Sequence, residues 1–484
     1  MTQRPFLVDQ DARRRYTQAR IKHWDGVARK FRNKRHFAAH YHRRLREIYG
    51  NLVTPGQRVL ELGCGAGELL ATFRPSLGVG VDFSAEMVRQ ASQRLPEHHF
   101  VQADALDFTP GTKFDVIILS DLVNDLWDVQ AALETAARAA DPHTRLILNF
   151  YSRVWEPVLW VAARLGLANS LLPQNWLTLE EMNGLLELTG FEVVRTWREV
   201  LLPVGVPGIH QAANKVLVRF WPLYHLALTN FMLARPRRSR WAQKTEPQVS
   251  VVVPVRNEAG NIAALFRRMP ELGRGTEMIF VEGHSTDGSY EAIQGEIETS
   301  SGRHCSLYRQ PGVGKGDAVR YGLAQANGEI LMIMDADLSV PPESLLRFYQ
   351  AVLAGAGELV NGVRLTYPVE GEAMRFLNLI GNKLFSLVLT WMIGQPIKDT
   401  LCGTKTLWKS DYLRIMANRK NISESDPFGD FDLIFGAAKL NLKILDLPIR
   451  YQPRTYGKTN ISRWQHGWLL LKMTVVAARR IRFV

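Results

Sequence analysis

The chain of 484 residues has little cysteine and no apolar leader. Its three cysteines, Cys64, Cys305 and Cys402, lie far apart and lack the spacing of metal ligands. This argues against a disulfide scaffold and favours a reducing cytosol. The N-terminus, MTQRPFLVDQDARRR, contains no apolar h-region, so we expect no signal peptide. The chain is too long for one ordinary domain, and we expect two or three.

A clean transmembrane helix is also missing from the sequence. Residues 376–394 come closest, but Asn378, Asn382 and Lys383 interrupt their apolar run. Residues 464–484 are apolar and basic. Both stretches fit helices that lie on a bilayer better than helices that cross it. We therefore expect a cytoplasmic protein that is peripheral on the cytoplasmic face of the membrane.

Acidic residues are scarce at both ends of the chain. Residues 1–48 contain 14 Lys and Arg against 4 Asp and Glu, and residues 451–484 contain 7 Lys and Arg and no acid. Since the whole chain has a net charge of +13, its centre is mildly acidic. Basic ends suggest an anionic membrane surface as a partner, and we expect no nucleic acid. For the N-terminal stretch, a solvated basic arm is an equal alternative.

A glycine-rich turn marks the first half. A predicted strand at residues 59–62, which contains Glu61, leads into this turn and then into a predicted helix. The alternating glycines of the turn are Gly63, Gly65 and Gly67. Glycine lets a backbone approach a ligand closely. Nineteen residues after Gly63, a second predicted strand ends on Asp82, which is placed to bond ribose hydroxyls.

This pattern could indicate a dinucleotide site, but its GxGxG spacing and the preceding Glu61 point elsewhere. The stretch resembles the class I S-adenosylmethionine methyltransferases, whose first motif reads E-x-G-x-G-x-G. The resemblance covers about residues 20–236. It implies that Glu61 and the three glycines surround the methionine end of S-adenosylmethionine, with Asp82 on the ribose and Asp104 near the adenine. A dinucleotide oxidoreductase and a purely structural Rossmann domain are the alternatives.

The methyl acceptor is not identified by these motifs. Four side chains should lie near the cofactor by topology, and any of them could orient or deprotonate a hydroxyl: Asp121, Asn124, Asp125 and Tyr151. Residues 154–167 and 214–224 read as apolar helices over the acceptor side. They could form a lid for an apolar substrate or belong to the core.

Two carboxylates end an apolar run in the second half. Residues 330–334 read as a buried strand and lead into Asp335 and Asp337. Burying two carboxylates is costly unless a cation meets them. Because residues two apart on an extended chain point the same way, one Mg²⁺ or Mn²⁺ could bind both. A solvated acidic turn is the alternative.

Three further stretches accompany this pair. A strand at residues 249–253 leads into PVRNE, a strand at residues 277–281 leads into EGHSTDGS, and Lys315 lies in a Gly-Lys-Gly loop. Strands that alternate with helices predict a parallel α/β sheet with ligands at the carboxyl ends of its strands. The four motifs together, over about residues 247–460, resemble glycosyltransferase family 2, the inverting enzymes of the A-type fold. Within it they are most similar to polyprenyl-phosphate glycosyltransferases such as dolichyl-phosphate mannosyltransferase.

The resemblance implies a role for each matching residue. A GDP- or UDP-sugar donor would contact Pro254, Glu258, Glu282, Asp287, Lys315 and Asp335. Asp335 and Asp337 would hold the metal, and Asp399 and Lys405 would contact the acceptor. Asp430 sits where many members carry the general base.

The predicted architecture is α/β throughout, with a Rossmann-like class I methyltransferase domain followed by an A-type nucleotide-diphospho-sugar transferase domain. The expected parts are a basic helical extension, the methyltransferase domain, a polar linker, the glycosyltransferase domain and a basic amphipathic C-terminal helix, at residues 1–50, 51–236, 237–248, 249–460 and 461–484.

We expect a bifunctional enzyme. One half would transfer a methyl group from S-adenosylmethionine, and the other would transfer a hexosyl group, with inversion and a divalent metal, to a polyprenyl phosphate or another lipid or glycan acceptor. A soluble enzyme that assembles and methylates a glycan is the alternative. A non-catalytic scaffold fits less well, because the DAD, Lys315 and GxGxG motifs are intact.

Overall fold

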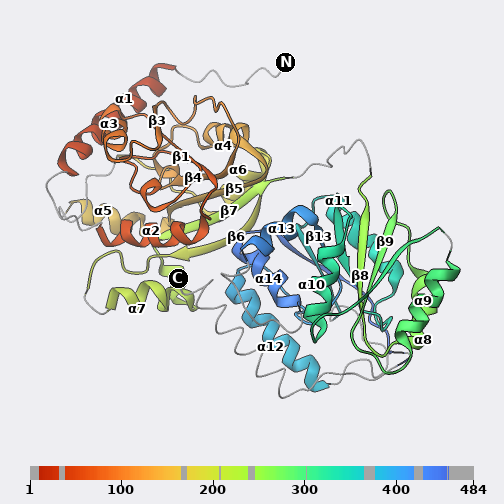
Figure 1. The fold of residues 1–484 in the computed structure, drawn as a ribbon. Coiled ribbons are helices and arrows are strands. Elements are labelled where there is room, and N and C mark those ends of the chain that lie inside the picture. The colour runs from red at the N-terminus through yellow and green to blue at the C-terminus, as the bar shows by residue number, and fades with distance from the viewer. Residues whose placement is uncertain are drawn as a thin grey trace. The chain divides into compact units, whose positions relative to one another are not determined.

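The computed structural model forms two compact units, and the boundary between them falls between Arg237 and Arg238. Figure 1 shows the first unit in red to yellow-green and the second in green to blue. The structure describes residues 10–31, 39–164, 172–206, 209–237, 246–300, 302–364, 376–418, 429–454 and 456. The expected C-terminal helix at residues 461–484 lies outside these residues. Each unit is described by itself.

The first unit is built on a seven-stranded sheet with the order β3-β2-β1-β4-β5-β7-β6. Its strands are β1 (Arg58–Leu62), β2 (Leu77–Asp82), β3 (His99–Gln102), β4 (Phe114–Ser120), β5 (Ala140–Tyr151), β6 (Phe191–Glu199) and β7 (Thr229–Pro236). All neighbours run parallel except at β7, which is antiparallel to both β5 and β6. The chain reverses its direction of travel across the sheet between β1 and β4, and ligands bind at such a switch point.

Helices cover both faces of this sheet (Figure 1). They are α1 (Gln10–Phe31), α2 (Ala39–Leu52), α3 (Ala85–Arg94), α4 (Val129–Ala139), α5 (Glu156–Arg164), α6 (Leu179–Leu188) and α7 (Ile209–Lys215). Because alternate residues of a strand face opposite sides, Ile117 of β4 packs in the core under α4 and α6, and Ile118 packs in the core under α2. Helix α2 buries Tyr41, Leu45 and Tyr49, which share one helical face.

Two expectations for the first unit were wrong in detail, and a third is confirmed over the described residues. The α-helix expected directly after Gly67 is only a short 3₁₀ turn, η1 (Leu70–Thr72), because Pro75 and the start of β2 follow at once. The helix expected at residues 154–167 is present as α5, which follows the turn η3 (Arg153–Trp155), and residues 165–167 lie outside the described residues. The helix expected at residues 214–224 is the end of α7 and two 3₁₀ turns, η4 (Leu217–Arg219) and η5 (Leu223–Leu226).

The second unit also has a seven-stranded sheet, in the order β10-β9-β8-β11-β13-β12-β14. Its strands are β8 (Val249–Val255), β9 (Thr276–Glu282), β10 (His304–Arg309), β11 (Ile330–Ile333), β12 (Leu359–Val363), β13 (Lys405–Trp408) and β14 (Ile444–Pro448). Only β13 runs antiparallel to its neighbours. Its helices are α8 (Ala259–Arg268), α9 (Ser289–Thr299), α10 (Lys315–Gln325), α11 (Leu345–Leu353), α12 (Phe376–Ile393), α13 (Lys409–Ala417) and α14 (Asp430–Lys439).

Helix α12 has an unusual distribution of side chains. Its inward face carries the buried polar residues Asn382 and Ser386, whereas Leu384, Leu387 and Val388 are exposed. The Asn382 amide donates to Asp399 at 2.7 Å, and the Ser386 hydroxyl donates to the Lys398 carbonyl at 2.8 Å. No helix among the described residues is both long and apolar enough to cross a membrane.

A buried ion pair joins the loop after α12 to the end of β12. Asp399 is fully buried, and its Oδ2 accepts from Arg364 Nε at 2.7 Å while its Oδ1 accepts from Arg364 Nη2 at 2.9 Å. Burial by itself would raise the pKa of Asp399, but the Arg364 guanidinium and the surrounding donors lower it to about 2. The charged carboxylate is therefore the form that the fold stabilises.

We predict that Asp399→Asn destabilises the second unit by about 3–5 kcal/mol at pH 7, because it leaves the Arg364 charge buried and unpaired. Since the pKa is depressed in the folded state, the contribution of the pair is complete above about pH 4 and is lost as the pH falls through about 2. The difference between wild type and variant should therefore shrink towards pH 2. Urea unfolding of the full chain, with hydrogen exchange of β12 and α12 to identify the transition, measures it.

The matched control is Glu343→Gln, which removes the carboxylate of the exposed pair between Glu343 and Arg268. Exposed pairs contribute about 0–1 kcal/mol. Equal losses in the two variants would contradict the structural role of the buried pair.

Candidate active sites

The glycine turn after β1 forms the base of the first site. Gly63, Gly65 and Gly67 all have positive φ, at 74°, 51° and 72°. A Cβ on Gly63 would lie 2.7 Å from Leu122 Cδ1, so the packing of the protein itself requires glycine there. A Cβ on Gly65 would meet no atom within 4 Å. Gly65 therefore borders open space that a ligand could fill.

Asp82, at the end of β2, faces this turn. Its Oδ2 accepts from the Gly65 amide and its Oδ1 from the Ser84 amide, both at 2.9 Å. Burial raises the pKa of Asp82, although these two hydrogen bonds oppose the change. The carboxylate is thus fixed beside the glycine turn, and Asp82 lines the pocket described below.

Glu61 is the most deeply buried acid of the first site. It is 3% exposed, and burial together with the nearby Asp82 charge raises its pKa well above the usual range. Its Oε2 has no hydrogen-bond partner among the described residues. Glu61 is not among the residues that line the pocket described next. A buried acceptor without a hydrogen-bond partner nevertheless fits a site whose ligand carries a cationic donor, as an α-amino group does.

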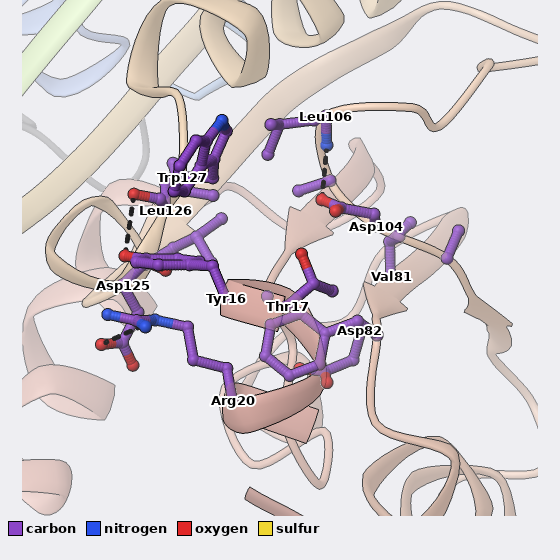
Figure 2. Close-up of a pocket in the computed structure, with 15 residues that line it drawn as sticks. Tyr16, Thr17, Arg20, Val81, Asp82, Asp104, Leu106, Asp125, Leu126 and Trp127 are labelled. Atoms are coloured by element: carbon purple, nitrogen blue, oxygen red, sulfur yellow. Dashed lines mark hydrogen bonds and ion pairs between the residues drawn. The ribbon is translucent and has the colours of Figure 1, made fainter. Parts of the chain in front are cut away.

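A pocket lies between the sheet edge and α1 (Figure 2). The residues that line it include Tyr16, Thr17, Arg20, Gly63, Asp82, Asp104, Asp125 and Trp127. Asp104 accepts from the Leu106 amide at 3.0 Å and from the Arg13 guanidinium at 3.4 Å. The pocket thus brings together Gly63, Asp82 and Asp104, which the sequence predicted as cofactor contacts.

The contribution of α1 was not predicted. Arg20 is 3% exposed, contacts the face of the Tyr16 ring and pairs with Asp125 at 3.8 Å. The N-terminal arginines were interpreted as a solvated or membrane-binding arm, yet two of them, Arg13 and Arg20, meet carboxylates at the pocket. The sequence shows an excess of arginine before the first strand. This excess does not distinguish a helix that packs over the pocket from a solvated basic segment.

The four candidate acceptor residues have different environments. Asn124 is structural, because its amide donates to the Asn175 carbonyl at 2.7 Å and its oxygen accepts from the Tyr151 amide at 3.0 Å. Asp125 accepts from Trp24 Nε1 at 3.1 Å and is held by α1. Asp121 and Tyr151 are not among the residues that line the pocket, and the Tyr151 ring lies 6.2 Å from that of Tyr41.

Asp121 follows β4 with a φ of 53°. Its Oδ1 accepts from the Tyr41 hydroxyl at 2.7 Å and from Asn149 Nδ2 at 2.5 Å, and Tyr49 in turn donates to Asn149 at 2.6 Å. Burial raises the pKa of Asp121 to about 7, against the effect of the two hydrogen bonds. A carboxyl group with this pKa can accept a proton near neutral pH.

The second site lies at the carboxyl ends of β8, β9 and β11. Lys315 Nζ, at the start of α10, lies 2.5 Å from Asp335 Oδ1. Asp337 is 5% exposed, and its Oδ1 accepts from the Ser339 amide at 3.0 Å and the Ser339 hydroxyl at 2.6 Å. Its Oδ2 lies 2.6 Å from Arg454 Nη2. Each carboxylate of the motif therefore already has its own cationic partner.

Arg454 links this motif to the end of β8. Its Nη1 lies 3.6 Å from Glu258 Oε1, and Asn261 donates to Glu258 Oε2 at 2.6 Å. Burial, with the Asp337 charge in addition, raises the pKa of Glu258 to about 7. The sequence did not single out Arg454, whose only signal was its place in the acid-free C-terminal stretch.

Asp287 and Glu282 hold the two loops at this edge together. Asp287 accepts from the Ala259 amide at 3.1 Å and from the Ser289 hydroxyl at 2.6 Å, so it joins the loop after β9 to the start of α8. These donors lower the pKa of Asp287 although burial opposes the change. Glu282 is 5% exposed and accepts from the Ser285 amide. Pro254, within β8, is partly buried.

The proposed acceptor residues lie deeper than expected. Asp399 and Lys405 are both fully buried, and Lys405 Nζ donates to Asn361 at 2.9 Å and to the Cys402 carbonyl at 2.7 Å. Contact between either residue and an acceptor stays a prediction, which requires that the surrounding elements open. Asp430 begins α14 after Gly429, and its side chain lies outside the described residues.

We predict that Asp121→Asn stabilises the first unit at pH 8 by about 1–4 kcal/mol. The raised pKa means that the folded state binds this proton more tightly than the unfolded state does. Stability therefore falls between about pH 4 and pH 7 in the wild type, and the neutral amide avoids this loss. Asparagine also tolerates the positive φ.

Urea unfolding at several pH values measures the effect. The gain should vanish near pH 4, and the exposed Glu187→Gln on α6 should show no such dependence on pH. A destabilisation by Asp121→Asn at pH 8 would contradict a raised pKa.

Two family models match the chain, one in each unit. Residues 59–143 match the family model described as a methyltransferase domain, and residues 250–416 match the model described as glycosyl transferase family 2. A TehB-like SAM-dependent methyltransferase from Corynebacterium glutamicum is similar in structure to 44% of the chain, over 98% of its own length, at 15% identity and a TM-score of 0.30.

Two relatives resemble the second half. The undecaprenyl-phosphate 4-deoxy-4-formamido-L-arabinose transferase of Pseudomonas aeruginosa is 32% identical over 120 residues, which cover 24% of this chain and only 35% of that protein. Glycosyltransferase AglJ of Haloferax volcanii is 25% identical over 229 residues, which cover 47% of this chain and 70% of the relative. Together with the two sheet topologies, these matches confirm the predicted fold class. The chain therefore joins a Rossmann-like methyltransferase domain to a glycosyltransferase family 2 domain with the A-type fold.

Proposed function

We propose that the chain is a bifunctional enzyme that transfers a methyl group from S-adenosylmethionine in its first unit and a sugar from a nucleotide-sugar donor in its second. The observation that supports this most directly is the same in both units. Buried strands end in carboxylates beside a glycine turn at the switch point of each sheet, where ligands bind. Inversion at the sugar and the use of Mg²⁺ or Mn²⁺ belong to this proposal.

In the first unit, Glu61 would bind the α-amino group of S-adenosylmethionine, Asp82 the ribose and Asp104 the adenine. The open space at Gly65 and the unpartnered Glu61 Oε2 fit this ligand. When bound, the sulfonium supplies an electrophilic methyl group. Among the acceptor-side residues, Asp121 is the one whose pKa near 7 suits removal of a proton from the acceptor.

In the second unit, Lys315 and the acids of the DAD motif would surround the diphosphate of a GDP- or UDP-sugar. Asp335 and Asp337 offer the oxygen ligands that Mg²⁺ and Mn²⁺ prefer, and both are held at the end of β11. The metal, when bound, offsets charge that develops on the leaving diphosphate. Lys315, positioned at the start of α10, would stabilise the same charge. Pro254, Glu258, Glu282 and Asp287 would hold the nucleoside.

A polyprenyl phosphate is the acceptor that we favour. The Pseudomonas relative is named for transfer to undecaprenyl phosphate, and the exposed leucines of α12 suit a helix that lies on a bilayer. A phosphate is already anionic, so its attack needs no general base. If the acceptor is instead a glycan hydroxyl, Asp430 would serve as the base. This second case corresponds to an enzyme that assembles and methylates a glycan.

We predict that the full chain binds S-adenosylmethionine and that Gly65→Asn abolishes this binding. Asparagine tolerates the φ of 51° and its Cβ would meet no protein atom within 4 Å, so the loss would come from the space that the ligand needs. Isothermal titration calorimetry measures the affinity. The matched control is Gly56→Asn, because Gly56 also has a positive φ and open space but precedes β1. Equal binding by both variants would refute the site.

We predict that Asp337→Asn lowers Mn²⁺-supported binding of UDP or GDP by about 100-fold or more. Loss of an outer-shell group at a metal site typically costs about 10–100-fold, and loss of a ligand costs more. The amide retains the bonds from Ser339, and the partly exposed Arg454 keeps Glu258 as a partner, so the fold should persist. Calorimetry with UDP and GDP, with and without Mn²⁺, tests this. The exposed Glu298→Gln on α9 is the control, and unchanged binding by Asp337→Asn would count against a metal at this motif.

A further inference from the structure

The first unit exposes an apolar surface that methyl transfer itself does not explain. Its members belong to the segment η3–α5 and to the segment α7–η5. They are Val154, Val158, Trp160, Val161, Ile209, Val216, Leu217, Phe220, Trp221 and Leu226. Trp221 is 76% exposed and Trp160 is 54% exposed. We call these ten residues the apolar patch.

The exposed valines of η3 and α5 recur at a helical spacing. Val154, Val158 and Val161 are spaced by four and three residues, so they share one helical face, and all are about half exposed. An amphipathic helix at the surface of a globular protein normally packs its apolar face against the core. Here the apolar face points outward, which excludes a core role for these residues. Residues 154–167 were expected to form either a lid or part of the core. Val154, Val158 and Val161 do not belong to the core.

The two segments meet. Trp155, at the end of η3, donates from Nε1 to the carbonyl of Leu226 at 2.8 Å, and Ser152 donates from its amide to the carbonyl of Leu228 at 2.7 Å. The exposed Val154 is therefore next to η5, whose Leu226 is exposed as well. Exposed apolar patches that extend over several elements mark interaction sites.

Charges around the patch have one dominant sign. Residues 200–236 contain no Asp or Glu. The Arg, Lys and His side chains in the two segments are Arg153, Arg164, His210, Lys215, Arg219 and His225. Arg164 stacks on Trp160 at 3.6 Å, Lys215 lies 3.5 Å from Glu47, and Arg219 is buried beside Glu199. Glu156 is the only acid within η3, α5, α7, η4 and η5. Exposed tryptophans among cations are the composition that the headgroup region of an anionic bilayer attracts.

We infer that the apolar patch docks the first unit onto an anionic lipid bilayer. The tryptophans and valines would enter the boundary between headgroups and acyl chains, while Arg153, Arg164 and Lys215 contact lipid phosphates. This membrane contact belongs to the methyltransferase unit, and it is additional to the one proposed for α12. It does not depend on the identity of the methyl acceptor.

Vesicle flotation with the full chain tests the inference. Vesicles of phosphatidylglycerol and phosphatidylcholine in equal parts should carry the wild type upward, and vesicles of phosphatidylcholine alone should carry much less of it. The double variant Trp160→Ser, Trp221→Ser should lower the partition coefficient on the anionic vesicles by about tenfold or more. Every variant retains residues 461–484, so any contribution from that segment is constant.

The matched control replaces two exposed apolar residues of the second unit, Val313→Ser with Leu413→Ser, and it should bind as the wild type does. Calorimetry with S-adenosylmethionine checks that the first unit of each variant is folded. If the wild type failed to bind this cofactor, the proposed methyl transfer would be refuted. The flotation result would still show whether the apolar patch binds the bilayer.

Three results would overturn the inference. The first is a wild type that does not float with anionic vesicles. The second is a double variant that floats as well as the control variant. The third is a change of sedimentation coefficient in the double variant without a change in flotation, which would identify a second copy of the chain as the occupant of the patch.

Discussion

The cost of removing carboxylates from water governs both units. Each sheet has buried apolar strands that end in acids, and each acid requires a partner. In the first unit the partners of Asp82 and Asp121 are backbone amides, a tyrosine and an asparagine, whereas Glu61 retains one oxygen without a partner among the described residues. In the second unit the partners of Asp335 and Asp337 are Lys315 and Arg454.

These two solutions suit different ligands. In the first site neutral donors hold Asp82 and Asp121, whereas Arg13 and Arg20 pair with Asp104 and Asp125 at the pocket. Glu61 retains an oxygen without a partner among the described residues, and S-adenosylmethionine carries positive charge on its sulfur and its amino group. Cationic side chains leave the second site close to balance, and a nucleotide diphosphate would arrive together with its metal. The same strand order, with the third, second, first and fourth strands of each unit side by side, positions both sites at a switch point. The difference between the sites therefore lies in the side chains.

The strands and the glycine turns could be predicted from the sequence because both depend on local chemistry. The apolar run before Asp335 and the spacing of Gly63, Gly65 and Gly67 need no tertiary information. Contributions from distant segments could not be predicted in this way. Arg13 and Arg454 lie far in sequence from the acids that they contact, and a basic stretch has the same composition whether it is solvated or folded against a site. The exposure of Val154, Val158 and Val161 could not be predicted from the sequence either. Periodicity identifies a helical face but does not show whether that face packs against the core or lies in solvent.

The position of helix α1 over the pocket bears on the turnover rate of the first unit. Tyr16, Thr17 and Arg20 line the pocket, and the Arg20 side chain is anchored to the Pro173 carbonyl and to Asp125. A ligand of the pocket is therefore covered by a helix with its own attachments to the sheet edge. If the cofactor proposed above leaves the pocket past α1, those attachments break and reform in every cycle. Turnover in this unit would then follow the lifetime of a closed helix, and product release would set the rate before the chemical step does.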